Sequence, residues 1–581
     1  MNLFLRKTLD RSKPNRRDFM VQTGCASLGI TSVVNTLSQL QLASTAAAAT
    51  GPADVKALVC IFLAGGNDSN NLLIPNGAGT PARIEYELSR GVPVYAGGPG
   101  GVAIPLGDIA AAGTAITPAN LPAETWEPSA GYLNNNVAVH PACANLKALF
   151  DAGDLAFVTN VGTLTQPGVT RTNFTDALPS KPPQLFSHSD QVLQWQSSIP
   201  DQPFTSGWGG RIADLLAPTE NMSSAGLAMG VSIAGVNSYQ VGVDEQPFVL
   251  STAGAQTLAG FGTNYANALV NTSLKPFVPP ANGGYDPLVD TNYKVTGAGN
   301  TQEGWRLRAL ERLMAMNHAN LFDKSFQATA KNARMTEGVV ADTLAFTSQT
   351  SGTNIVLDQW FTAAFGGNAG TANNDFANQL KMVARLIIGN YALLQGGTSR
   401  GNNRQTFFVQ LGGFDTHASQ IAVNNNNTVN TGAGQHSLLW TLSRAIKGFY
   451  DSIMNHPLGG ASLWNKTMGF TCSDFNRTFT PNKTDASGGS DHGWGGHAFV
   501  MGGAVKGKKI YGTFPELTVN GGIDCTGSRG RWIPSTSVDQ YAAKVAQWIG
   551  VPAGATMNGI FPNLTRFPVA ANLDFIDYSV T

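Results

Sequence analysis

Short, largely apolar runs are the dominant pattern in this sequence. They occupy residues 56–64, where the run after Lys56 is continuous, and residues 155–161, 405–411 and 467–472. Continuous apolarity over this length predicts strands that are buried on both faces, as the strands of parallel sheets are. Segments with the apolar spacing of helices lie between and after these runs, at residues 141–151, 376–394, 434–453 and 538–550. We therefore expect an α/β fold with a mainly parallel central sheet flanked by helices.

Two of the apolar runs end in the same way. The first is followed by two glycines, Asn67 and Asp68, and the third by two glycines, Phe414 and Asp415, with His417 two residues later. In open α/β sheets, ligands bind beyond the carboxyl ends of the strands. This layout places Asp68, Asp415 and His417 where functional side chains would lie, although an Asp at such a position can also serve only as an Asx-turn residue.

A third polar segment, residues 490–497 (SDHGWGGH), carries one carboxylate and two imidazoles between glycines. The whole chain has only 8 His, so two of them in one short turn are notable. Asp and His together suit a divalent ion such as zinc or manganese, whereas the simpler interpretation is a polar turn. We expect six side chains to meet at one edge of the sheet and to hold one or two divalent ions: Asp68, Asp415, His417, Asp491, His492 and His497.

The composition excludes several classes of protein. Charged residues make up only 13% of the chain and the formal net charge is zero, so there is no basic surface to hold nucleic acid. The 5 Cys include no CxxC pair, which argues against a Cys-rich zinc module. Cys60 and Cys472 lie in apolar runs and are expected to be buried free thiols; the pairing of the others is left open.

The first 49 residues have the three parts of an export signal. Arg16 and Arg17 form a twin-arginine pattern, a mildly apolar stretch follows from 21 to 42, and four alanines occupy 46–49. This order predicts export by the twin-arginine machinery to the periplasm or beyond the cell. No later run reaches the ~18 apolar residues of a spanning helix, so we expect no transmembrane segment in the mature protein.

The chain then divides into three parts. Residues 50–199 and 376–581 carry the α/β pattern, and residues 200–375 contain no cluster of ligand-like side chains. We interpret this middle part as an inserted cap, largely helical from 304 to 344, with a small antiparallel pair at 230–236 and 239–242.

A hydroxyl at the start of a helix is a candidate nucleophile. Ser187 and Ser189 precede a helix-like stretch that runs through Trp195. Such a serine often serves only as the helix cap. The same position faces free N–H groups and the positive end of the helix dipole, which suit an anion.

Several strings of the sequence together resemble the exported bacterial family called domain of unknown function 1501, over nearly the whole chain. Besides the twin-arginine start, they are LVCIFLAGGNDSNNLLIP, VHPACANLKALF, PPQLFSHSDQVLQWQS, QLKMVARLI, FFVQLGGFDTH, TCSDFNRT and DHGWGGHAFVMGGAVKGKKIYG. That family in turn resembles the alkaline phosphatase and sulfatase superfamily. The resemblance implies an alkaline phosphatase-like fold.

The same resemblance implies how the ligands are shared between two ions. Asp415, His417 and His497 would hold one ion, and Asp68, Asp491 and His492 the other. It also implies a Ser or Thr nucleophile, for which Ser187 is the best match and Ser189, Thr170 and Ser69 are the alternatives. Arg171 or Arg477 could hold an anionic ester, whereas the simpler interpretation of either is a surface or packing residue.

The expected function is that of an exported metal-dependent hydrolase of phosphate or sulfate esters, whose substrate is a small molecule or a glycan ester. The alternative is a non-catalytic exported protein that keeps this fold and binds components of the cell envelope. A serine esterase is disfavoured, because the chain has no GxSxG motif.

Overall fold

The computed structural model describes residues 54–120, 126–221, 227–254, 339–396, 401–568 and 572–580. The expected export segment, residues 1–49, and residues 304–338 of the expected helical span lie outside the described residues. Residues Ala53–Thr581 belong to one compact unit, which contains all of the described residues.

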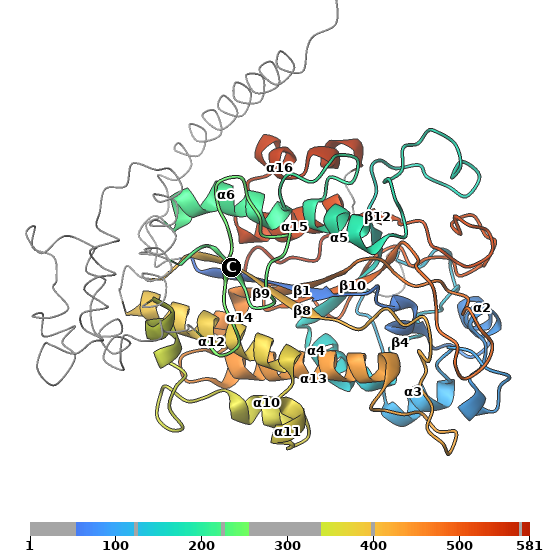
Figure 1. Ribbon diagram of the computed structural model, residues 1–581, viewed down its shortest axis with the longest axis horizontal. Coiled ribbons are helices and arrows are strands. Elements are labelled where there is room, and N and C mark those ends of the chain that lie inside the picture. The colour runs from blue at the N-terminus through green and yellow to red at the C-terminus, as the bar shows by residue number, and fades with distance from the viewer. Residues whose placement is uncertain are drawn as a thin grey trace, which may run out of the picture. The chain divides into compact units, whose positions relative to one another are not determined.

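A large, mostly parallel sheet forms the centre of the unit (Figure 1). Its strand order is β11, β5, β10, β9, β1, β8, β6, β7, with β12 beside β5. Neighbouring strands pair in parallel except around β10, which is antiparallel to both β5 and β9. The strands are β1 (Lys56–Leu63), β5 (Leu155–Gly162), β6 (Gly230–Ser232), β7 (Phe248–Val249), β8 (Arg404–Leu411), β9 (Thr467–Ser473), β10 (Gly496–Gly502), β11 (Ile510–Gly512) and β12 (Thr536–Ser537). The predicted α/β class with a mainly parallel sheet is confirmed.

The position of strand β1 explains why its sequence is apolar from Ala57 onward. All eight of its residues are buried. Because side chains alternate across a strand, Val59 and Ile61 enter the core on one face of the sheet, and Leu58 and Cys60 enter the core on the other. A strand in the middle of a sheet that is covered on both sides has no position for a polar side chain facing water.

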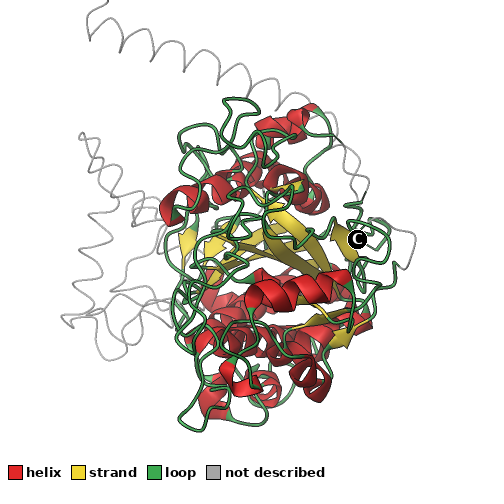
Figure 2. Ribbon diagram, turned by 90° about the vertical axis from the view of Figure 1, so that its right-hand side faces the viewer, coloured by secondary structure: helices red, strands yellow, loops and turns green. Residues whose placement is uncertain are grey.

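Helices cover both faces of this sheet (Figures 1 and 2). On one face lie α5 (His188–Ser197), α6 (Trp208–Glu220), α15 (Val538–Ile549) and α16 (Ala555–Ile560). On the other lie α4 (Ala144–Ala152), α10 (Asp358–Ala364), α11 (Ala369–Ala372), α12 (Asp375–Gln395), α13 (Gly434–Asn455) and α14 (Ala461–Asn465). The apolar stripe of each long helix is buried against the sheet, so the two cores have the sheet between them.

A smaller antiparallel sheet lies in the polypeptide between β1 and α4. It consists of β2 (Leu73–Pro75), β4 (Val137–Val139) and β3 (Ala115–Ile116), in that order. The same stretch contains α2 (Pro81–Arg90) and α3 (Leu106–Ala112). Pro81 stands in the first turn of α2, where its missing N–H costs nothing, and Thr80 caps that helix.

Part of the span predicted to be an inserted cap belongs instead to the central sheet. β6 and β7 extend the sheet beyond β8, and α6 covers one of its faces. The antiparallel pair predicted at 230–236 and 239–242 is wrong, because β6 pairs in parallel with β7 and β8. The alternation that suggested a hairpin comes from a short buried strand that lies between β8 and the edge strand β7.

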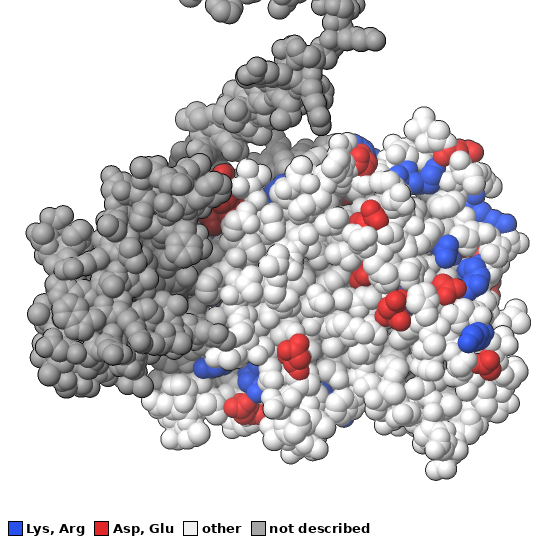
Figure 3. Space-filling view, viewed as in Figure 1, with Lys and Arg blue, Asp and Glu red and all other residues white. Residues whose placement is uncertain are grey.

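No helix among the described residues has the length and apolarity needed to cross a membrane. The surface seen in Figure 3 is mostly uncharged, with acidic and basic side chains interspersed. This agrees with the low content of charged residues.

Candidate metal centre

The ends of three neighbouring strands lie level at one edge of the sheet. Leu63 of β1 pairs with Leu411 of β8 on one side and with Ser473 of β9 on the other. Because β10 is antiparallel to β9, it begins where these strands end, and the polar segment before it reaches the same edge. One reversed strand therefore brings residues 490–497 next to the loops that follow β1, β8 and β9.

Two glycines allow these loops to touch. Gly65 has φ +111°, and a Cβ on it would lie 2.5 Å from the backbone nitrogen of Asp415. Gly66 has φ +82°, and a Cβ there would collide with the ring of Phe475. Both the positive φ and the close approach require glycine, which explains why Gly65 and Gly66 follow β1.

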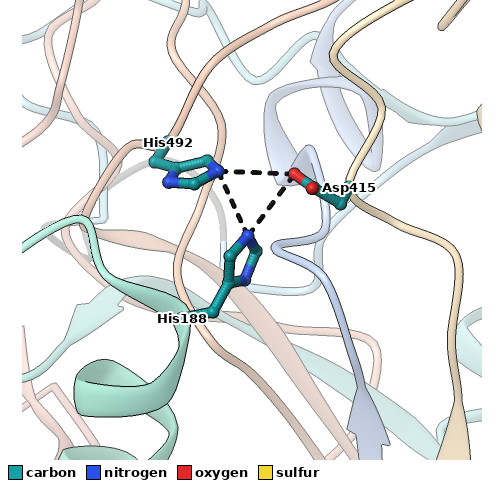
Figure 4. A group of neighbouring side chains, drawn as sticks. All are labelled: His188, Asp415 and His492. Atoms are coloured by element: carbon teal, nitrogen blue, oxygen red, sulfur yellow. Dashed lines mark hydrogen bonds and ion pairs between the residues drawn. The ribbon is translucent and has the colours of Figure 1, made fainter.

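Two imidazoles and one carboxylate, those of His188, His492 and Asp415, converge at this edge (Figure 4), and the imidazole of His417 lies beside them. His492 Nε2 lies 3.1 Å from His188 Nε2 and 2.9 Å from His417 Nε2. Asp415 Oδ1 lies 3.1 Å from His417 Nε2, 3.4 Å from His492 Nε2 and 3.5 Å from His188 Nε2. We call His188, Asp415, His417 and His492 the imidazole cluster.

The other ring nitrogen of each histidine faces a hydrogen-bond acceptor. His188 Nδ1 lies 2.7 Å from Asp474 Oδ2, and His417 Nδ1 lies 3.1 Å from Asp491 Oδ1. His492 Nδ1 lies 2.7 Å from the carbonyl oxygen of Phe186. Histidines that bind metal ions usually donate their second ring N–H to a carboxylate or a backbone carbonyl in this way.

These partners determine where the protons are. A carbonyl or carboxylate oxygen only accepts, so the proton of each neutral imidazole is assigned to Nδ1. Each Nε2 then carries a lone pair, and the imidazoles have no hydrogen to share among themselves. Three lone pairs and a carboxylate oxygen pointed at one place repel one another unless a cation lies between them.

The spacing fits such a cation. Ligand atoms at about 2.0–2.1 Å from a tetrahedral zinc ion lie about 3.3 Å from one another. The distances of His492 Nε2 and of Asp415 Oδ1 from each other and from the Nε2 atoms of His188 and His417 run from 2.9 to 3.5 Å. His188, Asp415 and His492 lie close enough together to share one ion, with His417 beside them, so the residues present fit a divalent ion in donor type and in spacing.

Neighbouring groups hold the imidazole cluster in shape. The ring of Phe475 packs against both His188 and His492, with ring centroids 4.7 and 4.6 Å apart. The buried guanidinium of Arg477 donates from Nη1 to Asp415 Oδ1 at 2.6 Å and from Nη2 to the carbonyl oxygen of Ser490. Burial would raise the pKa of Asp415, but the hydrogen bond and charge of Arg477 outweigh it and keep that pKa below its ordinary value.

The pKa of His492 is also shifted. Burial lowers it, and the nearby charges of Arg477 and His188 add to that effect, against the opposing hydrogen bond to the Phe186 carbonyl. A lowered pKa keeps His492 neutral near pH 7, and the neutral form is the one that can offer a lone pair to a cation.

Asp68, predicted to be a ligand, makes a different set of contacts. Its side chain is fully buried and forms an ion pair with Arg90 of α2. It also accepts hydrogen bonds from Asn70 and Gln420, and Gln435 donates to its backbone carbonyl. With both carboxylate oxygens occupied, Asp68 joins the loop after β1 to α2 and to the loop after β8.

Asp491 and His497 also lie outside the imidazole cluster. Asp491 accepts from His417 and Asn482, and pairs with Arg529, so it supports one of the clustered histidines. His497 is buried, stacks on Phe514 at 5.0 Å, and accepts from the backbone of Asn160 at 3.4 Å. Burial lowers its pKa to about 3.

The candidate nucleophiles have separate surroundings. Ser187 precedes α5 but its side chain does not cap the helix; its hydroxyl donates to Asp190 Oδ2 at 2.5 Å. Ser189 Oγ lies 3.3 Å from Ser187 Oγ. Thr170 contacts Thr172 in an exposed loop, and Ser69 is buried between Asn476 and the backbone of His497.

Sequence reasoning missed His188, Asp474 and the Phe186 carbonyl as parts of this site. His188 lies between two serines at the expected start of a helix, and the signal that could have identified it is that it is one of only 8 His and directly follows Ser187. Asp474 directly follows the end of β9, as Asp68 and Asp415 follow β1 and β8 closely, so the same rule would have found it. The role of a backbone carbonyl has no signal in the sequence.

Two further arginines approach the cluster from a loop built around Asp524. The carboxylate of Asp524 accepts from several backbone N–H groups of its own loop, including that of Arg531. Arg529 pairs with Asp491, and the Arg531 guanidinium lies 4.2 Å from the ring centroid of Phe186. In the described part of the chain, the Arg531 side chain has no hydrogen bond or ion pair. Arg171, in contrast, donates to the backbone of Asn520.

Comparison with known proteins gives one match. The family model described as "Protein of unknown function (DUF1501)" matches residues 55–522. Neither the curated proteins nor the solved structures gave a match. The matched span includes every residue of the imidazole cluster and their outer partners Phe186, Asp474 and Asp491. The chain is a member of the DUF1501 family.

Proposed function

We propose that this protein is an exported metal-dependent hydrolase of phosphate or sulfate esters. The observation that carries the proposal is the convergence of three Nε2 lone pairs and Asp415 Oδ1, each imidazole held from behind by an acceptor. The three nitrogen donors favour zinc, with manganese as the second choice, and the four residues of the imidazole cluster would hold one ion. When bound, such an ion polarises an ester oxygen and stabilises developing negative charge.

The residues around the cluster have separate parts in this proposal. Arg477 keeps Asp415 ionised and fixes its direction. Asp474 and Asp491 hold His188 and His417 with Nε2 facing inward. The side chains of Asp415 and His417 are each 45% exposed, so a substrate can approach from solvent.

The loop around Asp524, which carries Arg529 and Arg531, favours anionic esters as substrates. Arg531 has no acceptor for its guanidinium in the described structure, and Arg529 is 36% exposed beside Asp491. Guanidinium groups match the paired oxygens of phosphate and sulfate in shape and charge. Both arginines also adjoin groups that hold the histidines, namely Phe186 and Asp491, which supports binding of the anion at the imidazole cluster.

Ser187 is the proposed nucleophile. It adjoins His188 in the chain, and its hydroxyl donates to Asp190 rather than to the backbone of α5. A carboxylate at 2.5 Å can accept the hydroxyl proton as the oxygen attacks. The bond that forms joins Ser187 Oγ to phosphorus or sulfur, and the bond that breaks joins that atom to the leaving oxygen, which departs as the alcohol with the proton that Asp190 accepted. Water then cleaves the seryl ester, which releases phosphate or sulfate and restores Ser187.

The test measures bound metal and turnover separately. Purified protein is assayed for metal by elemental analysis, and for release of nitrophenol from p-nitrophenyl phosphate and p-nitrophenyl sulfate. We expect one ion per chain in the native protein, loss of metal and turnover together in Asp415→Ala, and loss of turnover alone in Ser187→Ala. Metal-free native protein that turns over either ester would contradict the proposal. Turnover that survives Ser187→Ala would reject that nucleophile.

A non-catalytic binding protein of the cell envelope is the second candidate. Four protein ligands can fill a tetrahedral zinc ion completely, as in structural zinc sites. Stoichiometric metal with no turnover across a broad panel of esters would favour this candidate over the hydrolase.

The same proposal has three further parts. They are a fold like that of alkaline phosphatases and sulfatases, a cap over the site, and export from the cytoplasm. Ligands that follow the ends of parallel strands support the first. For export, we expect that changing Arg16 and Arg17 together to Lys leaves the precursor in the cytoplasm, whereas the native chain reaches the periplasm. Fractionation and immunoblotting distinguish the two results.

A further inference from the structure

A cavity is present whose lining shares no residue with the imidazole cluster. Its volume is about 300 Å³, which is the lower end of the range for small-molecule pockets. Tyr95, Ile104, Asp108, His140, Ile421 and His436 are among the residues that line it. None of the residues that line it belongs to the imidazole cluster or to its outer partners. Its walls are mostly apolar, with a few polar groups between them.

His140, which is buried, presents a hydrogen-bond donor without a partner. Its Nδ1 accepts from the backbone N–H of Ala142 at 3.1 Å, so the proton of the neutral ring is on Nε2. Burial lowers the pKa of His140 to about 3, which keeps the ring neutral. Among the described residues, no acceptor lies within hydrogen-bond distance of that Nε2–H. A molecule in the cavity with an oxygen acceptor would satisfy it.

Asp108 supplies an unpaired negative charge. Its Oδ2 accepts from the hydroxyl of Tyr95 at 2.6 Å, and within the described ranges it has no ion-pair partner. Because a carboxylate beside an apolar cavity attracts a cation and repels an anion, it favours an amine over an acid. The neutral rings of His140 and His436, 5.4 Å apart between centroids, add no opposing charge.

We propose that this cavity binds a small cyclic amine that also carries a hydroxyl or carbonyl oxygen. The ring would contact Ile104, Ile421 and Tyr95, the amine would face Asp108, and the oxygen would accept from His140. This inference does not rest on the proposed hydrolase function, because it uses none of the residues that would hold the metal or the ester.

Three phenols whose para substituents are cationic, neutral and anionic test the role of charge. Tyramine, p-cresol and 4-hydroxyphenylacetate share a phenol and differ in charge, and calorimetry on the full chain gives their dissociation constants. We expect tyramine to bind with Kd of about 0.1–1 mM, and at least about tenfold more tightly than 4-hydroxyphenylacetate. No binding of tyramine, or tighter binding of the acid, would overturn the proposal.

Variants locate the binding. Ala422→Trp fills the cavity and should abolish tyramine binding, with Val429→Trp as a second filling variant if the first does not fold. Val236→Trp, at a side chain that is 88% exposed and outside the cavity, is the matched control and should bind as the native protein does. Asp108→Asn should bring the affinity for tyramine close to that for p-cresol. Equal binding by the native protein and both filling variants would refute the assignment.

Discussion

At the residue scale, the position of one proton on each imidazole decides what the cluster can do. Asp474, Asp491 and the Phe186 carbonyl take the Nδ1 protons, so the three Nε2 atoms face one another as lone pairs. A hydrogen-bonded histidine cluster would need the opposite tautomer on at least one ring. The geometry is therefore informative about a cation even though hydrogens themselves are assigned from their partners.

His188 and His497, which the sequence alone does not distinguish, have different expected roles. We expect His188→Ala to lose bound zinc, because it removes a ligand atom. We expect His497→Ala to keep the zinc and to lower the free energy of unfolding by about 2–4 kcal/mol, because it opens a cavity beside Phe514. Elemental analysis and urea unfolding measure the two effects. Loss of zinc from His497→Ala would restore the ligand set expected from sequence.

Asp68 gives a second residue-scale prediction. Removing one partner of a buried ion pair leaves the other charge without compensation, so Asp68→Ala should cost about 3–5 kcal/mol of unfolding free energy. The matched control is Asp358→Ala, which breaks an exposed pair with Lys381 and should cost at most about 1 kcal/mol. Urea unfolding in the presence of a chelator excludes any effect of bound metal. Equal costs in the two variants would contradict the structural role of Asp68.

The same residue shows what could be predicted from the sequence and what could not. Apolar runs predicted β1, β5, β8 and β9, because burial on both faces selects mostly apolar residues within the strand itself. The strand-end rule singled out Asp415 and His417, and the glycine-rich segment singled out His492; these three do converge. It also selected Asp68, whose direction depends on Arg90 in another element. No local sequence pattern indicates which side chains from distant segments become partners. None indicates that β10 runs antiparallel to its neighbours.

At the element scale, α15 contains an ionisable group in an unfavourable place. Asp539 lies in the first turn of this helix and is buried; its own backbone N–H and the side chain of Ser198 lie near the carboxylate but outside good hydrogen-bond geometry. Burial raises its pKa to about 7, although the charge of Arg211 on α6 opposes the shift. The folded chain therefore holds a proton that the unfolded chain gives up at about pH 4.

The sign of the resulting pH dependence follows from this. Between about pH 4 and pH 7 the folded state binds more protons than the unfolded state, so stability falls as pH rises and stays low above pH 7. Asp539→Asn should flatten this part of the curve and be more stable than the native protein at pH 8, by on the order of 2 kcal/mol. Urea midpoints at pH 5 and pH 8 test it. A variant less stable than the native protein at pH 8 would contradict the assignment.

At the scale of the whole molecule, the imidazole cluster ties together parts of the chain that are far apart in sequence. His188 begins α5, Asp415 and His417 follow β8, and His492 precedes β10. Through Asp474 the loop after β9 is also attached. An unfolded chain cannot keep these ligands together, so an ion would bind the folded state almost exclusively and add its binding free energy to stability.

Removing the ion should therefore lower the stability of the folded chain. At a free ion concentration of about 1,000 times Kd, bound zinc contributes about 4 kcal/mol, and its removal by a chelator should lower Tm by about 4 °C for a chain of this length. Scanning calorimetry with and without chelator measures this, and added zinc should reverse it. His188→Ala is the control, because a protein without the site has nothing to lose to the chelator. An equal fall in Tm in native protein and His188→Ala would show that the chelator acts elsewhere, and no fall in the zinc-loaded native protein would show that the ion does not join these segments.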